Sequence, residues 1–143
     1  QGALRETAPM DTSLARHTVT LRPEPGANAV ARDTATRFLA DARDHGRPVP
    51  DPAPDTLLLL VTELVTNALR HTEGPCTLRL TLHPRAIDVD VTDTSPQRPT
   101  PRAPDHRGSG GWGWNLVHHL TEYVDIRPTP DGGKTIHARI SLE

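Results

Sequence analysis

A carboxylate and an amide lie four residues apart in the most apolar stretch of the chain, 55–72 (DTLLLLVTELVTNALRHT). Residues four apart share one face of a helix, so we expect Glu63 and Asn67 side by side, with Arg70 and His71 one turn further on. The amide oxygen of Asn67 suits Mg²⁺, which takes one or two protein oxygens beside nucleotide phosphates. Glu63 could orient a water or take a proton from an attacking hydroxyl. The spacing therefore indicates a site for a metal-bound phosphate ligand.

An alternative for the same spacing is a hydrogen bond between the two side chains on a solvated helix face. For an isolated Glu-x-x-x-Asn that arrangement is the commoner one. Here apolar residues flank the pair on both sides, and burying a carboxylate or an amide without a partner is costly. The apolar flanks therefore favour a bound ligand.

Two further stretches carry groups that suit a nucleotide. Asp93 ends an alternating run and opens a long loop, and a carboxylate there can accept a hydrogen bond from an exocyclic amine such as that of adenine. Taken alone, Asp-Thr-Ser-Pro is more often simply a turn. The glycine run at 108–113 (GSGGWG) precedes apolar helical spacing, and its N–H groups can approach phosphate oxygens. Taken alone, such a run is also typical of a flexible linker.

Composition limits the classes of protein. The chain has 143 residues, which suits one domain, and its net charge of −2 gives no basic field for nucleic acid or an acidic membrane. A single cysteine, Cys76, excludes an internal disulfide framework. No apolar run reaches the roughly 18 residues of a membrane span, so we expect a soluble, cytoplasmic protein. Lys134 is the only lysine, and no GxxxxGK[ST] motif precedes a helix.

Hydrophobic periodicity predicts the elements that must position these groups. Their order indicates an α+β domain, a two-layer sandwich whose mixed, mostly antiparallel sheet carries helices on one face. We expect a flexible leader at 1–15 and one domain at 16–143. The predicted elements are an edge strand at 18–21, helices at 27–43 and 55–72, a hairpin of 76–82 and 86–92, a helix at 114–120, and a terminal hairpin of 123–127 and 135–142.

Local signals mark the faces and ends of these elements. The helix at 27–43 is amphipathic and ends near Gly46, a common C-terminal signal. The apolar face of this helix is predicted to contain Val30, Ala31, Thr34, Ala35, Phe38, Leu39 and Ala42. Asp51 and Asp55 are candidate N-caps of the helix at 55–72. In 86–92 apolar and polar residues alternate, which is typical of a sheet with one buried face.

Four stretches occur in the order and spacing of the gyrase, Hsp90, histidine kinase and MutL ATP-binding superfamily. They are Glu63–His71 (ELVTNALRH), Asp93–Pro96 (DTSP), Gly111–Val117 (GWGWNLV) and Gly133–Ile140 (GKTIHARI). More narrowly, residues 16–143 resemble the small anti-sigma-factor serine kinases of the RsbW and SpoIIAB type, because that branch also has Asp-x-Ser-Pro where the wider superfamily often has Asp-x-Gly-x-Gly. The resemblance implies the Bergerat ATP-binding fold.

The resemblance implies roles for individual residues around ATP and Mg²⁺. Asn67 would bind the Mg²⁺ that bridges the ATP phosphates, and Glu63 would be the general base. Asp93 would hold the adenine amine. Thr135 would lie beneath the adenine and support Asp93 through a direct or water-mediated contact.

The phosphate side of the implied site lies later in the chain. Gly111 and Gly113 would form the glycine box behind the phosphates, and 93–110 would be a lid over ATP. Loops of that length are often lids or binding loops. Arg107 and Arg102, both in the lid, are the charges best placed to reach the γ-phosphate, and for each a solvated loop charge is an equal alternative.

Several other residues are expected to be structural. His71 suits an end-of-helix residue satisfied by backbone, and Trp114 suits the core. The pair His118-His119 has no spaced partner for a zinc site. For Trp112, packing against the lid, contact with a partner and filling of the core remain open.

The resemblance implies an ATP-dependent serine/threonine kinase that acts as an anti-sigma factor. It would phosphorylate a STAS-type anti-anti-sigma partner and sequester a sigma factor, with no direct contact to nucleic acid or membrane, and a homodimer is common in the family. One alternative is an ATP-binding regulator without kinase activity that docks a partner, and the proline-rich lid favours this alternative. Another is an interaction domain without nucleotide. ATP affinity tests the last alternative, and turnover separates the first two.

Overall fold

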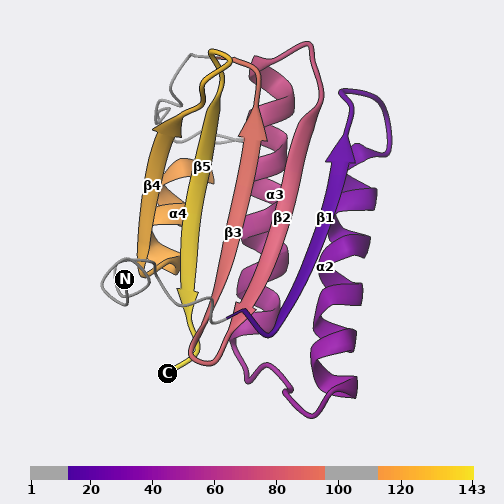
Figure 1. Ribbon diagram of the computed structural model, residues 1–143, viewed down its shortest axis with the longest axis vertical. Coiled ribbons are helices and arrows are strands. Elements are labelled where there is room, and N and C mark those ends of the chain that lie inside the picture. The colour runs from indigo at the N-terminus through magenta and orange to yellow at the C-terminus, as the bar shows by residue number, and fades with distance from the viewer. Residues whose placement is uncertain (1–12, 96–112) are drawn as a thin grey trace, which may run out of the picture.

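The computed structural model describes residues 13–95 and 113–143. Its elements are β1 (Ala15–Leu21), α2 (Ala27–Asp44), α3 (Ala53–His71), β2 (Cys76–His83), β3 (Ala86–Asp93), α4 (Gly113–Leu120), β4 (Tyr123–Pro128) and β5 (Lys134–Ser141). The strands form one sheet in the order β1-β2-β3-β5-β4, and every pairing between neighbours is antiparallel. The helices all lie on one face of this sheet (Figure 1). The predicted α+β fold is confirmed.

The strand predictions are confirmed, with one change at the start. β1 is an edge strand, as expected, but it begins at Ala15, within the stretch predicted as a leader. The N–H of Leu14 also donates to the carbonyl oxygen of Leu82 at 2.7 Å. The rest of the predicted leader, 1–12, lies outside the described residues. Both predicted hairpins form, β2 with β3 and β4 with β5.

Helix α2 packs on the sheet mainly through small residues. Phe38 and three alanines of its predicted apolar face are buried, whereas Val30, also assigned to that face, is 47% exposed. The helix ends before Gly46, whose φ of +78° is strained for a residue with a side chain. The predicted stop signal at this glycine is therefore confirmed.

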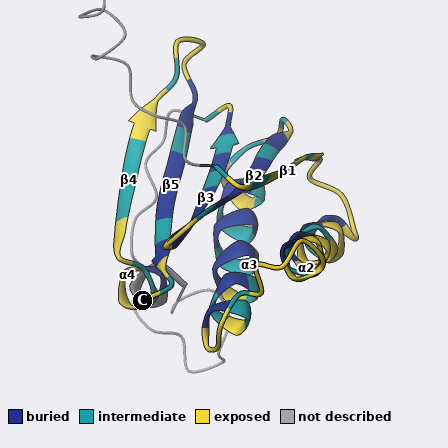
Figure 2. Ribbon diagram, turned by 60° about the horizontal axis from the view of Figure 1, so that its bottom comes forward, coloured by how far each residue is buried: buried dark blue, intermediate teal, exposed yellow. Residues whose placement is uncertain are grey.

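Helix α3 is more deeply buried than helix α2 (Figure 2). Its core-facing residues are all at most 1% exposed, and they are Leu57, Leu60, Val61, Leu64, Val65 and Ala68. Burying each leucine contributes about 1.5–3 kcal/mol. The predicted N-caps are wrong, because the N-cap residue is Pro52 and no side chain caps the helix. Asp55 lies in the first turn instead, where its charge interacts favourably with the helix dipole.

The sheet face away from the helices carries a charged network. Asp88 and His137 are each 7% exposed on this face, so the prediction of a single buried face is incomplete. The guanidinium of Arg139 donates to both Asp88 carboxylate oxygens, at 2.7 and 2.9 Å. The His137 Nδ1 lies 2.6 Å from Asp90 Oδ1. These side chains bury one another, since they come from adjacent strands β3 and β5.

The charged network makes stability depend on pH. The hydrogen bond to Asp90 raises the pKa of His137 above its ordinary 6.5, against the opposing effect of burial. A raised pKa means that protonated His137 stabilises the fold fully below the unfolded pKa, and that this contribution is lost as pH rises through the folded pKa. We expect the free energy of unfolding in urea to fall as the pH rises above the ordinary histidine value of 6.5 and through the raised pKa of His137, and to fall less in His137→Gln.

The exposed His45 supplies the matched control. His45→Gln should keep the wild-type pH dependence, because His45 bonds the backbone oxygen of Asp41 and lies in no such network. A His137→Gln profile parallel to the wild type would contradict the assignment.

Within the described residues, no helix is long and apolar enough to cross a lipid bilayer.

Candidate functional site

The predicted carboxylate and amide lie on the C-terminal half of α3. Glu63 and Asn67 are both half-buried, beside the fully buried Leu64 and Val65, whereas Arg70 is exposed. The alternative of a solvated face therefore fits these two side chains poorly, and Arg70 does not share their environment. Helix α3 contacts β3, β5 and α4. Glu63 and Asn67 therefore lie on a helix that packs against both the sheet and a neighbouring helix.

The C-terminal ends of α3 and β3 meet at one end of the sheet (Figure 1). The hydroxyl oxygens of Thr72, after α3, and Thr94, after β3, are 2.7 Å apart. At Gly74 a Cβ would lie 3.0 Å from the Thr94 Oγ1, so the two chain segments pack closely there. These contacts place the last turns of α3, including Asn67, at the same end of the sheet as Asp93.

Asp93 is a buried carboxylate with an ionic partner. Its residue exposure is 3% and that of Lys134 is 4%. The Lys134 Nζ donates to both Asp93 oxygens, at 3.0 and 2.9 Å, and to the carbonyl oxygen of Ser95 at 3.2 Å. The N–H of Ser95 donates to Asp93 Oδ1 at 2.9 Å. The end of β3 is therefore held by the start of β5.

Gly133 lets β5 approach the end of β3 closely. A Cβ built at this position would lie 2.0 Å from the carbonyl oxygen of Asp93 and 3.0 Å from its carbonyl carbon. No side chain fits there unless the backbone moves. The glycine therefore sets the position of Asp93 relative to β5.

We expected Thr135 to support Asp93 through a direct or water-mediated contact, and the structure shows no direct contact between these two described residues. The Thr135 Oγ1 is 2.7 Å from the Thr92 Oγ1, on the opposite face of the sheet from Lys134, because successive side chains of a strand point to opposite faces. Lys134 makes the direct contact to Asp93 instead. Sequence reasoning missed this lysine, although period-two alternation with the buried Ile136 and Ala138 places it on the helix-facing side.

The phosphate side of the predicted site is mostly outside the described residues. Gly113 is described as the first residue of α4, which contacts α3. The predictions that lie outside the described residues concern Gly111, Trp112, Arg102, Arg107 and, as side chains, His71 and Trp114.

The donor chemistry of α3 fits a magnesium ion held largely by phosphates and water. Asn67 offers a half-buried neutral amide oxygen, with the Glu63 carboxylate one turn away, and such oxygens are ligands that Mg²⁺ accepts. Among residues 13–95 and 113–143, no group of three or more His, Cys, Asp or Glu side chains is arranged to hold a metal ion.

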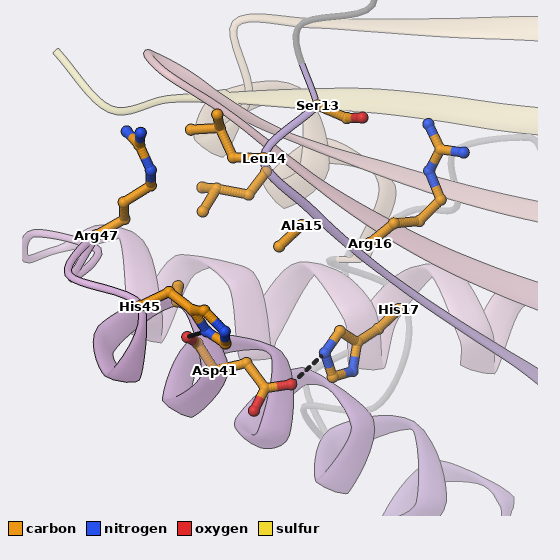
Figure 3. A pocket seen from close by; sticks show the side chains of 10 residues that line it. Ser13, Leu14, Ala15, Arg16, His17, Asp41, His45 and Arg47 are labelled. Atoms are coloured by element: carbon orange, nitrogen blue, oxygen red, sulfur yellow. Dashed lines mark hydrogen bonds and ion pairs between the residues drawn. The ribbon is translucent and has the colours of Figure 1, made fainter.

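A separate groove of about 640 Å³ lies between β1 and the C-terminal end of α2 (Figure 3). Arg16 and Arg47 stand at its two ends. Two histidines of the groove contact Asp41: His17 Nε2 lies 2.7 Å from Asp41 Oδ2, and His45 Nδ1 lies 2.8 Å from the Asp41 carbonyl oxygen. None of the predicted site residues lines this groove, so the candidate site remains at Asp93.

Three features of this structure are typical of an ATPase domain of the Bergerat type. They are an antiparallel sheet with helices on one face, a helix with Glu-x-x-x-Asn, and a buried aspartate at the end of β3. The family model of the histidine kinase-like ATPase domain matches residues 21–140. The chain therefore belongs to this family, and the predicted superfamily is confirmed. A search of curated protein sequences gives no match.

Solved structures with the same fold include two from bacteria. One is that of the RsbU and RsbW domains of Rv1364c from Mycobacterium tuberculosis, with a TM-score of 0.63 and 17% identity over 89% of this chain. This chain spans 33% of the length of that one. Another is the SiaB–SiaC complex from Pseudomonas aeruginosa, with a TM-score of 0.58 and 10% identity, covering 97% of this chain and 96% of the other. At these identities the similarity concerns the fold.

Proposed function

We propose that the protein is an ATP-dependent serine/threonine protein kinase that acts as an anti-sigma factor. It phosphorylates a serine of a STAS-type anti-anti-sigma partner and sequesters a sigma factor. The observation that carries the proposal is the half-buried pair Glu63 and Asn67 at the end of the sheet where the buried Asp93 lies. Membership of the ATPase family and the similarity in fold to an RsbW domain support it.

Asp93 is suited to recognise the adenine amine. An ionised carboxylate only accepts hydrogen bonds, at roughly four positions. The described contacts use two of these for Lys134 and one for Ser95. Within the described residues one position is left, and an exocyclic N–H of adenine can donate there.

Glu63 and Asn67 serve the phosphate end of the same ligand. Asn67 would hold Mg²⁺, and the ion would supply positive charge that offsets the negative charge of the ATP phosphates. Glu63 accepts the proton of the partner's serine hydroxyl as its oxygen attacks the γ-phosphorus. The bond between that phosphorus and the bridging oxygen breaks, ADP leaves, and the partner carries the phosphate.

Removing the amide at Asn67 tests the metal. In Asn67→Ala we expect calorimetry to show ATP binding that no longer strengthens when Mg²⁺ is added, because the protein ligand of the ion is gone. Arg70→Ala, on the same helix but exposed, is the matched control and should keep the Mg²⁺ dependence. A normal Mg²⁺ response in Asn67→Ala would exclude this residue as the ligand.

Phosphotransfer is the direct test of the kinase. The protein is incubated with Mg²⁺, ATP radiolabelled at the γ-phosphate, and STAS-type proteins encoded beside it, and we expect one of them to be labelled on serine. ATP binding without labelling of any such partner would contradict the kinase and favour a regulator that acts by docking. Light scattering of the purified protein tests whether it forms a homodimer. Capture of a sigma factor from the cytoplasm tests whether the protein sequesters such a factor.

A further inference from the structure

We propose that Lys134 is the positioning residue through which the site distinguishes adenine from bases that carry a carbonyl in place of the amine. This inference rests on the proposed function, since it concerns the same nucleotide site. The Asp93 carboxylate is fully buried, and its ionic partner is the only lysine of the chain, whose side chain is 5% exposed.

Every proton of the Lys134 ammonium is used by the protein. An ammonium group has three donors. Two point to the Asp93 oxygens and the third points to the carbonyl oxygen of Ser95. The lysine therefore has no proton left for a base, and its effect on a ligand must pass through Asp93.

The contacts around Asp93 fix both its charge and its direction. Two hydrogen bonds from one ammonium hold the plane of the carboxylate, and the Ser95 N–H holds Oδ1. Charged hydrogen bonds of this kind are stronger than neutral ones. A buried carboxylate without a countercharge is costly, and it would reorient instead. Lys134 thus keeps Asp93 a pure acceptor in one orientation.

A pure acceptor separates two classes of purine. The adenine amine donates to it, whereas the carbonyl of hypoxanthine or guanine places lone pairs against lone pairs. Lys134 cannot relieve that repulsion, because its donors are already engaged. A site of this kind is selective because the wrong base leaves its buried polar groups unpaired, which weakens binding.

The experiment compares ATP with inosine triphosphate, which carries a carbonyl where adenine has the amine. For the wild type we expect calorimetry to give about 10- to 100-fold tighter binding of ATP, the range of one hydrogen bond to a charged group. In Lys134→Met, which keeps the length of the side chain but not its charge, we expect this ratio to fall below about threefold. Lys134→Arg, which restores a cation, should recover part of the ratio.

Arg127→Met is the matched control, because Arg127 is an exposed cation on the neighbouring strand β4. It should keep the wild-type ratio. If Lys134→Met also keeps that ratio and only melts at a lower temperature, the lysine is merely structural and the inference is overturned while the nucleotide site stands. If the wild type binds neither nucleotide, the proposed function itself fails before any variant is compared.

A second comparison covers the case in which Lys134→Met does not fold. The double variant Asp93→Asn with Lys134→Met removes both charges and leaves no buried ion unpaired. Because the lysine acts only through Asp93, the double variant should bind ATP no more weakly than Asp93→Asn alone. A further loss of affinity in the double variant would show a direct role for Lys134 and overturn the inference.

Discussion

Replacing Glu63 with glutamine is expected to lower the rate of phosphotransfer by about 10²- to 10⁴-fold, the usual contribution of a general base. Glutamine has nearly the same shape as glutamate, so the half-buried position on α3 is kept. What is lost is the capacity to accept the proton of the serine hydroxyl. ATP binding should persist, because this role of Glu63 arises only as the hydroxyl attacks.

Two measurements separate the effect on the rate of phosphotransfer from the effect on ATP binding. Single-turnover transfer to the partner gives the rate, and calorimetry gives the affinity for ATP. Glu73→Gln makes the same chemical change at an exposed position just beyond the end of α3, and it should transfer phosphate at the wild-type rate. A Glu63→Gln protein that transfers phosphate as fast as the wild type would remove the general base from the proposed mechanism.

Replacing Gly133 with alanine is expected to have the largest effect on nucleotide binding. The new Cβ would meet the Asp93 carbonyl oxygen at 2.0 Å, so β3 and β5 must separate at this point. Overpacking of this kind typically costs about 1–3 kcal/mol in the free energy of unfolding. Because the carboxylate of Asp93 moves with its backbone, we expect ATP affinity to fall by at least about tenfold, equivalent to 1.4 kcal/mol.

The adjacent glycine gives a close control. Gly132 has φ +92°, and a Cβ at this position would meet no atom within 4 Å, so alanine there strains the turn without touching Asp93. Urea unfolding should show Gly132→Ala destabilised by about 1 kcal/mol, while calorimetry should show ATP bound as in the wild type. Normal ATP binding by Gly133→Ala would contradict the importance of this close approach.

Much of the fold was predictable because its signals are local. The period of 3.6 in 55–72 predicted α3, and strict alternation in 76–82 and 86–92 on either side of a short connection predicted the hairpin of β2 and β3. Errors occurred where short-range signals compete. Asp51 and Asp55 both suit a cap, yet the chain enters α3 through Pro52 without one. Periodicity identifies an element more reliably than it identifies its end.

The candidate site was predictable in part. Glu63 and Asn67 could be placed together because four residues along a helix return to the same face. The partner of Asp93 could not be found in this way, since Lys134 lies 41 residues further along the chain. Strand pairing between β3 and β5 brings the two together, and that register was not readable from either strand alone.

The amino-acid sequence by itself determined the α+β class, the amphipathic helices and the stripe on Asp55–Thr72 that holds Glu63 and Asn67. These follow from spacing along one segment. Only the tertiary structure decided which residue faces Asp93, because the register between β3 and β5 sets which residues of the two strands lie opposite each other. Lys134 is therefore turned toward the helices and Thr135 toward Thr92. Contacts between distant segments depend on how the strands pair and the layers pack, and local periodicity does not predict either.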